Sequence, residues 1–220
     1  DNGDPITQVT ITGGNSSTTF YYYDEEAGDW TISAARATVN TGTDSLTVLP
    51  STLETYIFSA VGAQTAGTGW SMTVTGIDDY ANTVTSATND IDMTNTGNAA
   101  FYTDGTYGTP TTSYTLAAGE ATIYVRDLTA ESFTITATDS NTKSGTSASI
   151  TVAPAGVDHF TLNAPANTTA GERAAYTVTR QDVYNNSITS GVQTVYLYRT
   201  GVTDANAVFY DAASGGNTIT

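Results

Sequence analysis

The chain repeats itself out of phase, and this limits what it can fold into more than any other feature of the sequence. Thr65-Ala66-Gly67 opens a segment that returns near the C-terminus at Thr169-Ala170-Gly171, with the later letters at constant spacing. A second match links the N-terminus to the middle, where residues 30–34 resemble residues 133–137. The repeat unit is therefore about a hundred residues, an ordinary domain size.

Only one copy of the repeat is complete. Residues 55–154 contain both halves, residues 1–50 match only the second half, and residues 157–220 match only the first half. Placed in the order 157–220 followed by 1–50, the terminal segments make a second full copy. The sequence therefore predicts one complete domain and one domain that is split between the two chain ends.

Two explanations of this frame stay open. The stretch is either one period of a longer tandem chain or a separate subunit whose terminal halves pair with neighbouring copies, and both give an end-to-end fibre. A third arrangement, in which the two ends close on each other within one molecule, is disfavoured by geometry. A sandwich of seven-residue strands is roughly 25 Å tall, which keeps half-domains at opposite poles apart.

Composition predicts an all-β fold. Threonine makes up about a fifth of the chain, and Thr, Tyr and Val suit pleated, half-buried strands, whereas helix formers such as Leu, Lys and Gln are sparse. Short segments alternate apolar and polar residues, as at 30–34, 133–137 and 195–198, and the aromatic run 20–23 is also expected to be a strand. Many short strands separated by glycine-rich turns favour a β-sandwich.

Charge and cysteine content exclude several function classes. The formal net charge is −16 with a single lysine, which argues against nucleic acid as a partner, because phosphate binding needs clustered Lys and Arg. No apolar run approaches the roughly twenty residues that span a bilayer, so membrane insertion is not expected. The absence of cysteine removes disulfides and thiol chemistry.

The repeated letters resemble a known family. Thr-Ala-Gly, an alternating Val-Thr strand and an Asp-x-Tyr-x-Asn turn occur at residues 65–82 and again at residues 169–186. In this respect the chain is similar to the bacterial immunoglobulin-like repeats of large surface proteins, including the invasin and intimin type. The resemblance implies tandem immunoglobulin-like β-sandwiches at the cell surface, in stalks, adhesins, layer proteins or enzyme accessory modules.

The split domain predicts an interface between units. Left unpaired, each half would expose sheet edges and half a core, which favours pairing with another chain. We therefore expect residues 1–50 of one unit to complete the sheets begun by residues 157–220 of the preceding unit. The apolar residues predicted to be buried at this interface are Val9, Ile11, Phe20, Trp30, Ile32, Leu46, Val48, Val178, Val195, Leu197 and Phe209.

No catalytic residues are predicted, and calcium is the one cofactor that the sequence suggests. His159 is the sole histidine, and the carboxylate pairs fit solvated charge better than an active site. Oxygen-rich clusters are what calcium requires, and the Asp-x-Tyr-x-Asn motif also fits a simple Asx turn. The candidate calcium ligands are Asp24, Glu25, Glu26, Asp29, Asp78, Asp79 and Asn82.

Three Asn-x-Ser/Thr sequons, at Asn15, Asn167 and Asn185, are candidate glycosylation sites. Taken together, the sequence predicts a non-enzymatic structural protein outside the cell, whose units follow one another head to tail in a filament, stalk or surface array. Its partners are then other copies of itself. Two alternatives stay open: an adhesin that binds host or carbohydrate ligands, and an accessory region of a secreted polysaccharide-degrading enzyme.

Overall fold

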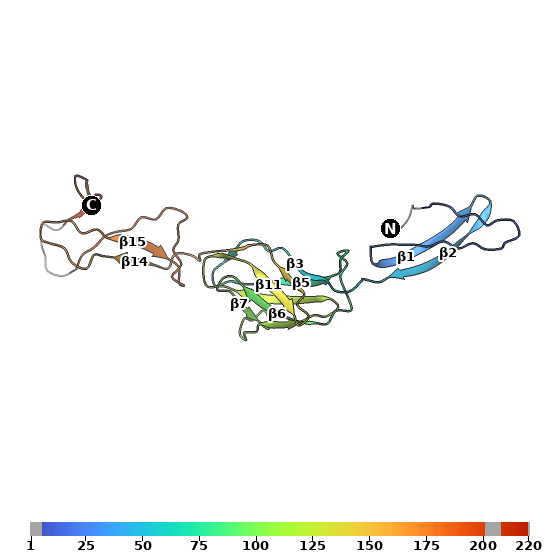
Figure 1. The fold of residues 1–220 in the computed structure, drawn as a ribbon. Coiled ribbons are helices and arrows are strands. Elements are labelled where there is room, and N and C mark those ends of the chain that lie inside the picture. Colours follow the sequence, from blue (N-terminus) through green and yellow to red (C-terminus); the bar gives the residue numbers. More distant parts are fainter. Residues whose placement is uncertain (1–5, 201–207, 220) are drawn as a thin grey trace.

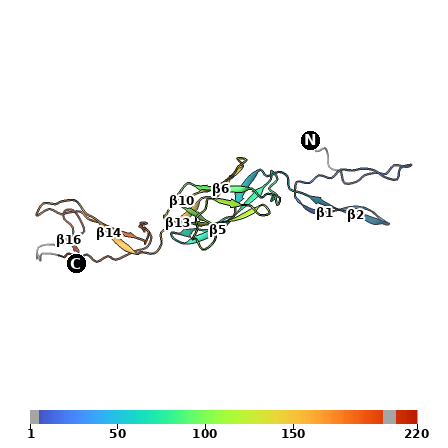
Figure 2. The same cartoon turned by 90° about the horizontal axis from the view of Figure 1, so that it is seen from below.

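The computed structural model describes residues 6–200 and 208–219, and these residues form strands and no helix. The N-terminal segment, the middle domain and the C-terminal segment follow one another along an elongated molecule (Figure 1). A view at right angles shows the same row, with the terminal segments at opposite ends (Figure 2). The predicted join between Thr220 and Asp1 lies outside the described residues.

The middle domain is a β-sandwich, as the sequence predicts. One sheet has the order β3 (Thr55–Phe58), β5 (Gly69–Ile77), β9 (Glu120–Arg126) and β7 (Ala100–Tyr102). The facing sheet has the order β12 (Ser144–Thr146), β11 (Ile135–Asp139), β6 (Asp90–Asn95) and β8 (Ser113–Thr115). A third, smaller sheet has the order β10 (Ser132–Phe133), β13 (Ile150–Ala153) and β4 (Gln64–Thr65).

Alternation along the strands builds the core between these sheets. In β5 every second residue is buried, and Trp70, Met72 and Val74 point inward while their neighbours are more exposed. Strand β9 follows the same rule, and its Ile123 and Val125 are fully buried. Successive side chains of a strand point to opposite faces, so the threonines between the apolar residues face outward.

The halves of the repeat are interleaved in both large sheets. Strand β9, from the second half, lies between β5 and β7, which both come from the first half. Strand β6, from the first half, lies between β11 and β8 of the second half. Even the parallel pairing of β4 with β13 joins one half to the other. Neither half can therefore form these sheets without the other.

The terminal segments form isolated hairpins. In the N-terminal segment β1 (Gly28–Arg36) pairs with β2 (Val39–Val48), and Trp30 lies opposite Leu46. In the C-terminal segment β14 (His159–Asn163) pairs with β15 (Thr177–Gln181), and β16 (Phe209–Tyr210) pairs with β17 (Thr218–Ile219).

Two strand predictions were wrong. Residues 20–23 and residues 195–198 alternate as strands do, yet neither stretch is a strand. Their counterparts in the middle domain are β9 and β6, the two strands that pair on both sides with the opposite half of the repeat. These two segments have a strand sequence but lack the neighbours that would supply their hydrogen bonds.

Candidate assembly interface

The joint between the N-terminal segment and the middle domain is built on the first Asp-x-Tyr-x-Asn motif. Asp78 follows β5, and its Oδ1 accepts hydrogen bonds from the amides of Tyr80 and Asn82, both at 2.9 Å. The Asp78 amide donates to the Asn82 carbonyl at 3.0 Å and closes the loop. This is the Asx-type turn that the motif predicts, and Asp78 is buried within it.

The same two side chains cross the joint. The other carboxylate oxygen of Asp78 accepts from the Ser51 amide at 2.8 Å, just after the Pro50 linker. Asn82 bonds the loop before β1 twice, accepting from the Ala27 amide at 2.9 Å and donating to the Glu25 carbonyl at 2.8 Å. The motif therefore fixes the linker and the neighbouring loop at once.

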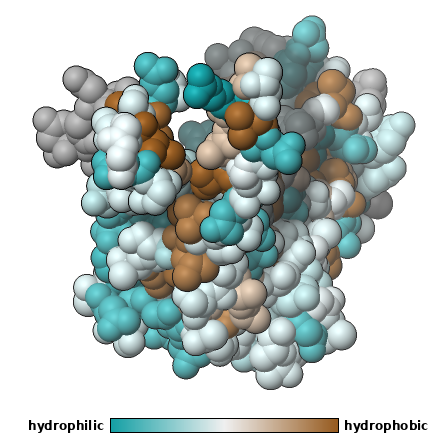
Figure 3. Space-filling model, turned by 90° about the vertical axis from the view of Figure 1, so that its right-hand side faces the viewer, coloured by the Kyte–Doolittle hydropathy of each residue, from teal (hydrophilic) through white to brown (hydrophobic). Residues whose placement is uncertain are grey.

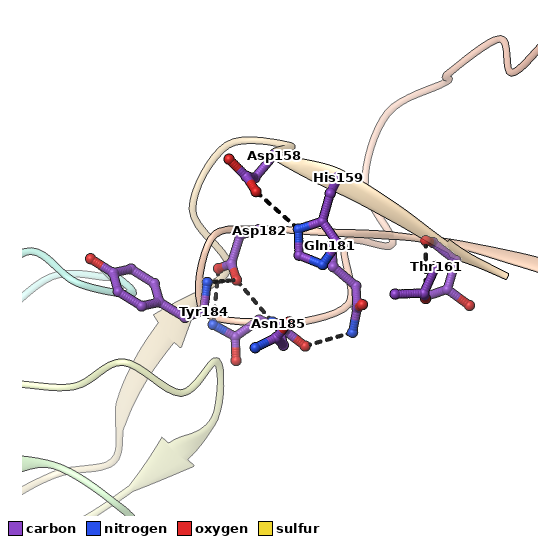
Figure 4. Close-up of polar contacts among 9 residues, drawn as sticks. Asp158, His159, Thr161, Gln181, Asp182, Tyr184 and Asn185 are labelled. Atoms are coloured by element: carbon purple, nitrogen blue, oxygen red, sulfur yellow. Dashed lines mark hydrogen bonds and ion pairs between the residues drawn. The ribbon is translucent and has the colours of Figure 1, made fainter.

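The joint between the middle domain and the C-terminal segment has the same construction. Asp182 accepts from the amides of Tyr184 at 2.9 Å and Asn186 at 2.8 Å, and its second oxygen accepts from the Ala155 amide at 2.8 Å. Asn186 accepts from the Ala130 amide at 2.8 Å and donates to the Leu128 carbonyl at 2.7 Å. Asp182 is fully buried. Figure 4 shows this turn.

Hydrogen bonding sets the charge state of the two aspartates. Burial alone would raise the pKa of each carboxyl group, but the amide and Asn donors favour the ionised form, and the pKa values of Asp78 and Asp182 are lowered. Both carboxylates are therefore ionised at neutral pH. They bind N–H donors as charged acceptors, which makes stronger hydrogen bonds than neutral pairs make.

The second joint has an additional contact. The ring of Tyr184 points from the turn toward the middle domain (Figure 4) and covers Gly67, where an added Cβ would overlap the ring. Gly67 has φ +81° and donates its amide to the Asp127 carbonyl at 2.7 Å. Thr65-Ala66-Gly67 therefore forms a socket for Tyr184, next to the loop that Asn186 binds.

The predicted calcium ligands are not gathered into a metal site. Within residues 6–200 and 208–219, no group of three or more His, Asp or Glu side chains is placed to hold a metal ion. Asp78 uses its oxygens for amide donors, and Asp29 accepts from the Thr47 hydroxyl at 2.6 Å. Asp24 caps its own loop by accepting from the Glu26 amide and the Tyr22 hydroxyl. Glu25, Glu26 and Asp79 line one hollow of about 520 Å³ beside Asn82.

The predicted interface residues are exposed or half-buried, whereas most of their counterparts in the middle domain are buried. Leu46 is 40% exposed and its counterpart Ile150 only 3%. Phe20 is 47% exposed and Ile123 is fully buried. The remaining predicted interface residues are all exposed or half-buried: Val9, Ile11, Trp30, Ile32, Val48, Val178, Val195, Leu197 and Phe209. Figure 3 views the end that carries the N-terminal segment and shows apolar surface among the polar side chains.

The candidate modification sites are accessible. Asn15, Asn167 and Asn185 are all exposed, Asn15 in a turn closed by its amide bond to the Thr12 carbonyl at 3.0 Å. Their glycosylation stays a prediction. His159 begins β14, and its Nδ1 lies 2.9 Å from the Asp158 carboxylate, both partly exposed.

One buried group of the middle domain was not predicted from the sequence. Asp127 is 1% exposed, and its Oδ1 accepts from the Thr129 amide at 2.7 Å. Its Oδ2 has no hydrogen-bond partner among the described residues. Burial raises the pKa of this carboxyl group. Its counterpart in the other repeat is Asp24, which is not buried. The two aspartates have the same place in the repeat, so the sequence gives no sign that only Asp127 is buried.

No protein-family model and no curated protein matches the chain. Solved structures resemble it in part. A β-glucuronidase from Parabacteroides merdae is 12% identical over 51% of this chain and 14% of that chain, with a TM-score of 0.39. Surface layer protein SbsC, domains 4–9, is 20% identical over 87% of this chain and 30% of that chain, with a TM-score of 0.36. A glycosyl hydrolase family 2 member from Bacteroides cellulosilyticus is 14% identical over 58% of this chain and 17% of that chain, with a TM-score of 0.41.

The chain spans less than a third of the length of these three structures. Among the described residues, no helix has the length and apolar character needed to cross a membrane.

Proposed function

We propose that this chain is the repeating unit of an extracellular filament, stalk or surface array, in which immunoglobulin-like domains follow one another head to tail. Residues 1–50 of one unit complete the domain that residues 157–220 of the preceding unit begin. The units are continuous through peptide bonds or associate as separate chains, and the completed split domain has the same structure in both cases. The protein is a mechanical element and carries no catalysis.

The interleaving of the two halves in the middle domain is the observation that carries this proposal. In each large sheet there, a strand of one half lies between two strands of the other half: β9 between β5 and β7, and β6 between β11 and β8. The terminal segments hold one half each and lie at opposite ends of the molecule (Figures 1 and 2). Within one molecule they are on either side of a whole domain, and in this proposal a neighbouring unit supplies the missing strands.

The middle domain also predicts which strands pair when the two halves of the split domain come together. By correspondence with β9, the segment that contains Phe20 enters between β15 and the strand β16. By correspondence with β6, the segment that contains Val195 and Leu197 enters beside β1. Each fully buried large apolar side chain contributes about 1.5–3 kcal/mol, part of which offsets the ordering of the two segments. Core burial and new main-chain hydrogen bonds thus act together, as in donor-strand complexes.

The two joints along each unit support a mechanical role. Each ties its linker, a neighbouring loop and a buried carboxylate into one set of hydrogen bonds. Pro50 and Pro154 precede these contacts and restrict the linker backbone. A fibre of domains held this way resists bending without disulfides, and the chain contains no cysteine.

Light scattering after size exclusion tests the proposal on two versions of the full chain. The first has the native order, measured over a range of concentrations. The second is permuted, with residues 157–220 placed before residues 1–156. The native order should grow into open-ended polymers if the units are separate subunits. The permuted chain should stay a 22.9 kDa monomer, since both of its domains are complete.

Hydrogen exchange on the permuted chain supplies the decisive readout. We expect the amides around Phe20 and Val195 to be protected there and to exchange freely in the native-order monomer at low concentration. If the native-order chain never polymerises while the permuted chain is protected, the units are joined by peptide bonds in a continuous tandem array. Free exchange at both segments in the permuted chain would overturn the proposal.

A further inference from the structure

The two joints differ in one respect. At the second joint Tyr184 covers Gly67 of the preceding domain. At the first joint Tyr80 occupies the same place in the same turn, and half of its surface is exposed. The turns match closely, since the residue after each tyrosine has a positive φ, +66° at Ala81 and +68° at Asn185.

An open hollow lies where the first joint lacks its socket. It has a volume of about 520 Å³, and it is lined by Glu25, Glu26, Asp79, Tyr80, Ala81 and Asn82. At the second joint, the Gly67 turn donates its amide to the Asp127 carbonyl and is covered by Tyr184, the counterpart of Tyr80. The hollow therefore has the position of a Thr-Ala-Gly turn that residues 1–50 do not contain.

The missing turn exists at the other end of the chain. Thr169-Ala170-Gly171 belongs to the half-domain that residues 1–50 are proposed to complete, and it corresponds in sequence to Thr65-Ala66-Gly67. Gly171 has φ +88°, close to the +81° of Gly67. Gly67 is covered by a tyrosine, whereas among the described residues nothing beyond its own chain neighbours lies within 4 Å of the position that a Cβ of Gly171 would take. Each end thus presents one half of the same contact.

We propose that Tyr80 and the hollow beside it receive the Thr169-Ala170-Gly171 turn of a second copy of this chain. The inference rests on the proposed function and adds a contact to it. Tyr80 covers Gly171 of the preceding unit, and the Gly171 amide donates to the Asp24 carbonyl, the counterpart of Asp127. The C-terminal half of one unit then binds both the N-terminal segment and the middle domain of the next.

Glycine is required at the socket for two independent reasons. A side chain at a positive φ is strained, and a Cβ would enter the tyrosine ring, as it would at Gly67. The second reason applies at position 171 only if the tyrosine of the next unit is seated there. Gly191 separates the two effects, since it has φ +75° and space for a side chain: among the described residues, nothing beyond its chain neighbours lies within 4 Å of where a Cβ would be.

Photo-crosslinking tests the contact directly. Tyr80→p-benzoylphenylalanine places a photoreactive tyrosine analogue in the turn, and mass spectrometry identifies the peptide that it joins on illumination. In native-order polymers we expect a crosslink between copies, to the peptide that contains Gly171. In the permuted chain the same crosslink should form within one molecule. Tyr184→p-benzoylphenylalanine is the positive control, with a crosslink to the Gly67 turn.

The outcomes separate the contact from the assembly. If the permuted chain is folded and protected while position 80 joins another region or nothing, the contact is wrong and the proposed function stands. If the permuted chain lacks protection at Phe20 and Val195, the proposed function itself fails. Gly171→Ala should weaken association between copies about tenfold and remove the crosslink, whereas Gly191→Ala should retain it. Retention of the crosslink in Gly171→Ala would also overturn the contact.

Discussion

The N-terminal hairpin and the second half of the middle domain have similar sequences and opposite surroundings. Phe133 is 2% exposed and Ile135 fully buried, whereas the corresponding Trp30 and Ile32 of β1 are only half-buried. The β1 hairpin is also longer and more regular than the short strands that replace it in the middle domain. The pairing of β1 with β2 thus needs only residues close together in the chain, whereas burial of their apolar side chains needs strands from the other half of the domain.

This difference shows where the stability of such a domain lies. Adjacent strands of one half can form a hairpin, but the core lies between strands that come from both halves. A single hairpin buries too little apolar surface to be stable alone in water. In the proposed assembly the interface between units is therefore equivalent to a domain core, and mutations should act on assembly in one region and on folding in the other.

Truncation of the matched aromatic pair should have the largest effect on this comparison. Phe133→Ala should destabilise the middle domain by about 3–5 kcal/mol, because it leaves a cavity in the core. Trp30→Ala should leave the unfolding of the middle domain unchanged in the native-order monomer and lower the stability of the split domain in the permuted chain by a similar amount. Chemical denaturation followed by tryptophan and tyrosine fluorescence measures both.

The joints can be broken at their buried carboxylates. Asp182→Ala removes the acceptor of three amides, each a charged hydrogen bond of about 1.5–3 kcal/mol, and leaves the Ala155 amide unpaired. Asp78→Ala should do the same at the first joint. We expect faster hydrogen exchange at Ala155 and Ser51 respectively. Asp79→Ala is the matched control, since Asp79 is exposed and should change stability by less than about 0.5 kcal/mol. Equal effects of Asp78 and Asp79 would contradict the role of the motif.

Acid should loosen both joints before it unfolds the sandwich. The lowered pKa values of Asp78 and Asp182 mean that their contribution to stability is full above the ordinary carboxyl pKa of about 4 and is lost as the pH falls below it. Asp127 has the opposite sign, because its raised pKa means that protonation favours the folded middle domain. Small-angle scattering from pH 7 to pH 3 should show a wider range of shapes at low pH, and Asp182→Asn should reduce the change.

Replacing a glycine by alanine at the same place in each copy of the repeat tests the comparison without removing any contact. Gly145 lies in β12, where a Cβ would overlap the Tyr56 carbonyl of β3, and overpacking of this kind costs about 1–3 kcal/mol. The corresponding Gly42 has open space around it. Gly42→Ala should therefore leave the native-order monomer unchanged and weaken polymer growth, measured by light scattering. Unchanged growth would show that β2 does not enter a completed sheet beside β14.

Sequence alone predicted the all-β architecture and the turns at the two joints, but not the contacts that cross the joints. Alternation in segments such as 133–137 was sufficient to predict the all-β sandwich, whereas the division of the second domain between the two chain ends stays a prediction. The strands expected at 20–23 and 195–198 are absent, because period-two alternation reports the face that a residue prefers and not whether a neighbouring strand is present. Their sequences fit the middle strands of a sheet that this chain does not complete.

The joints show the second limit of sequence reasoning. The recurrence of Asp78 and Asn82 at Asp182 and Asn186 predicted a turn with a local mechanism, and the turn is there. That the same Asp and Asn side chains also bind the linker and the preceding loop depends on contacts between residues far apart in the chain. Spacing along the sequence carries no signal for such contacts. The calcium prediction for Asp78 and Asn82 was based on oxygen-rich side chains that cluster in the sequence, and such a cluster cannot show that amide donors bind the carboxylate.

The smallest expected effect concerns the residue after each tyrosine. Ala81 and Asn185 have nearly the same positive φ, yet asparagine adopts this left-handed conformation more readily than alanine. Ala81→Asn should therefore stabilise the first turn by about 0.5–1 kcal/mol, and Asn185→Ala should destabilise the second by a similar amount. Thermal unfolding of the native-order chain at low concentration measures both, because both turns and the linkers that they bind lie within one molecule there. If the shifts had the same sign, the two turns would not be equivalent, and the construction of one joint could not be used to infer the other.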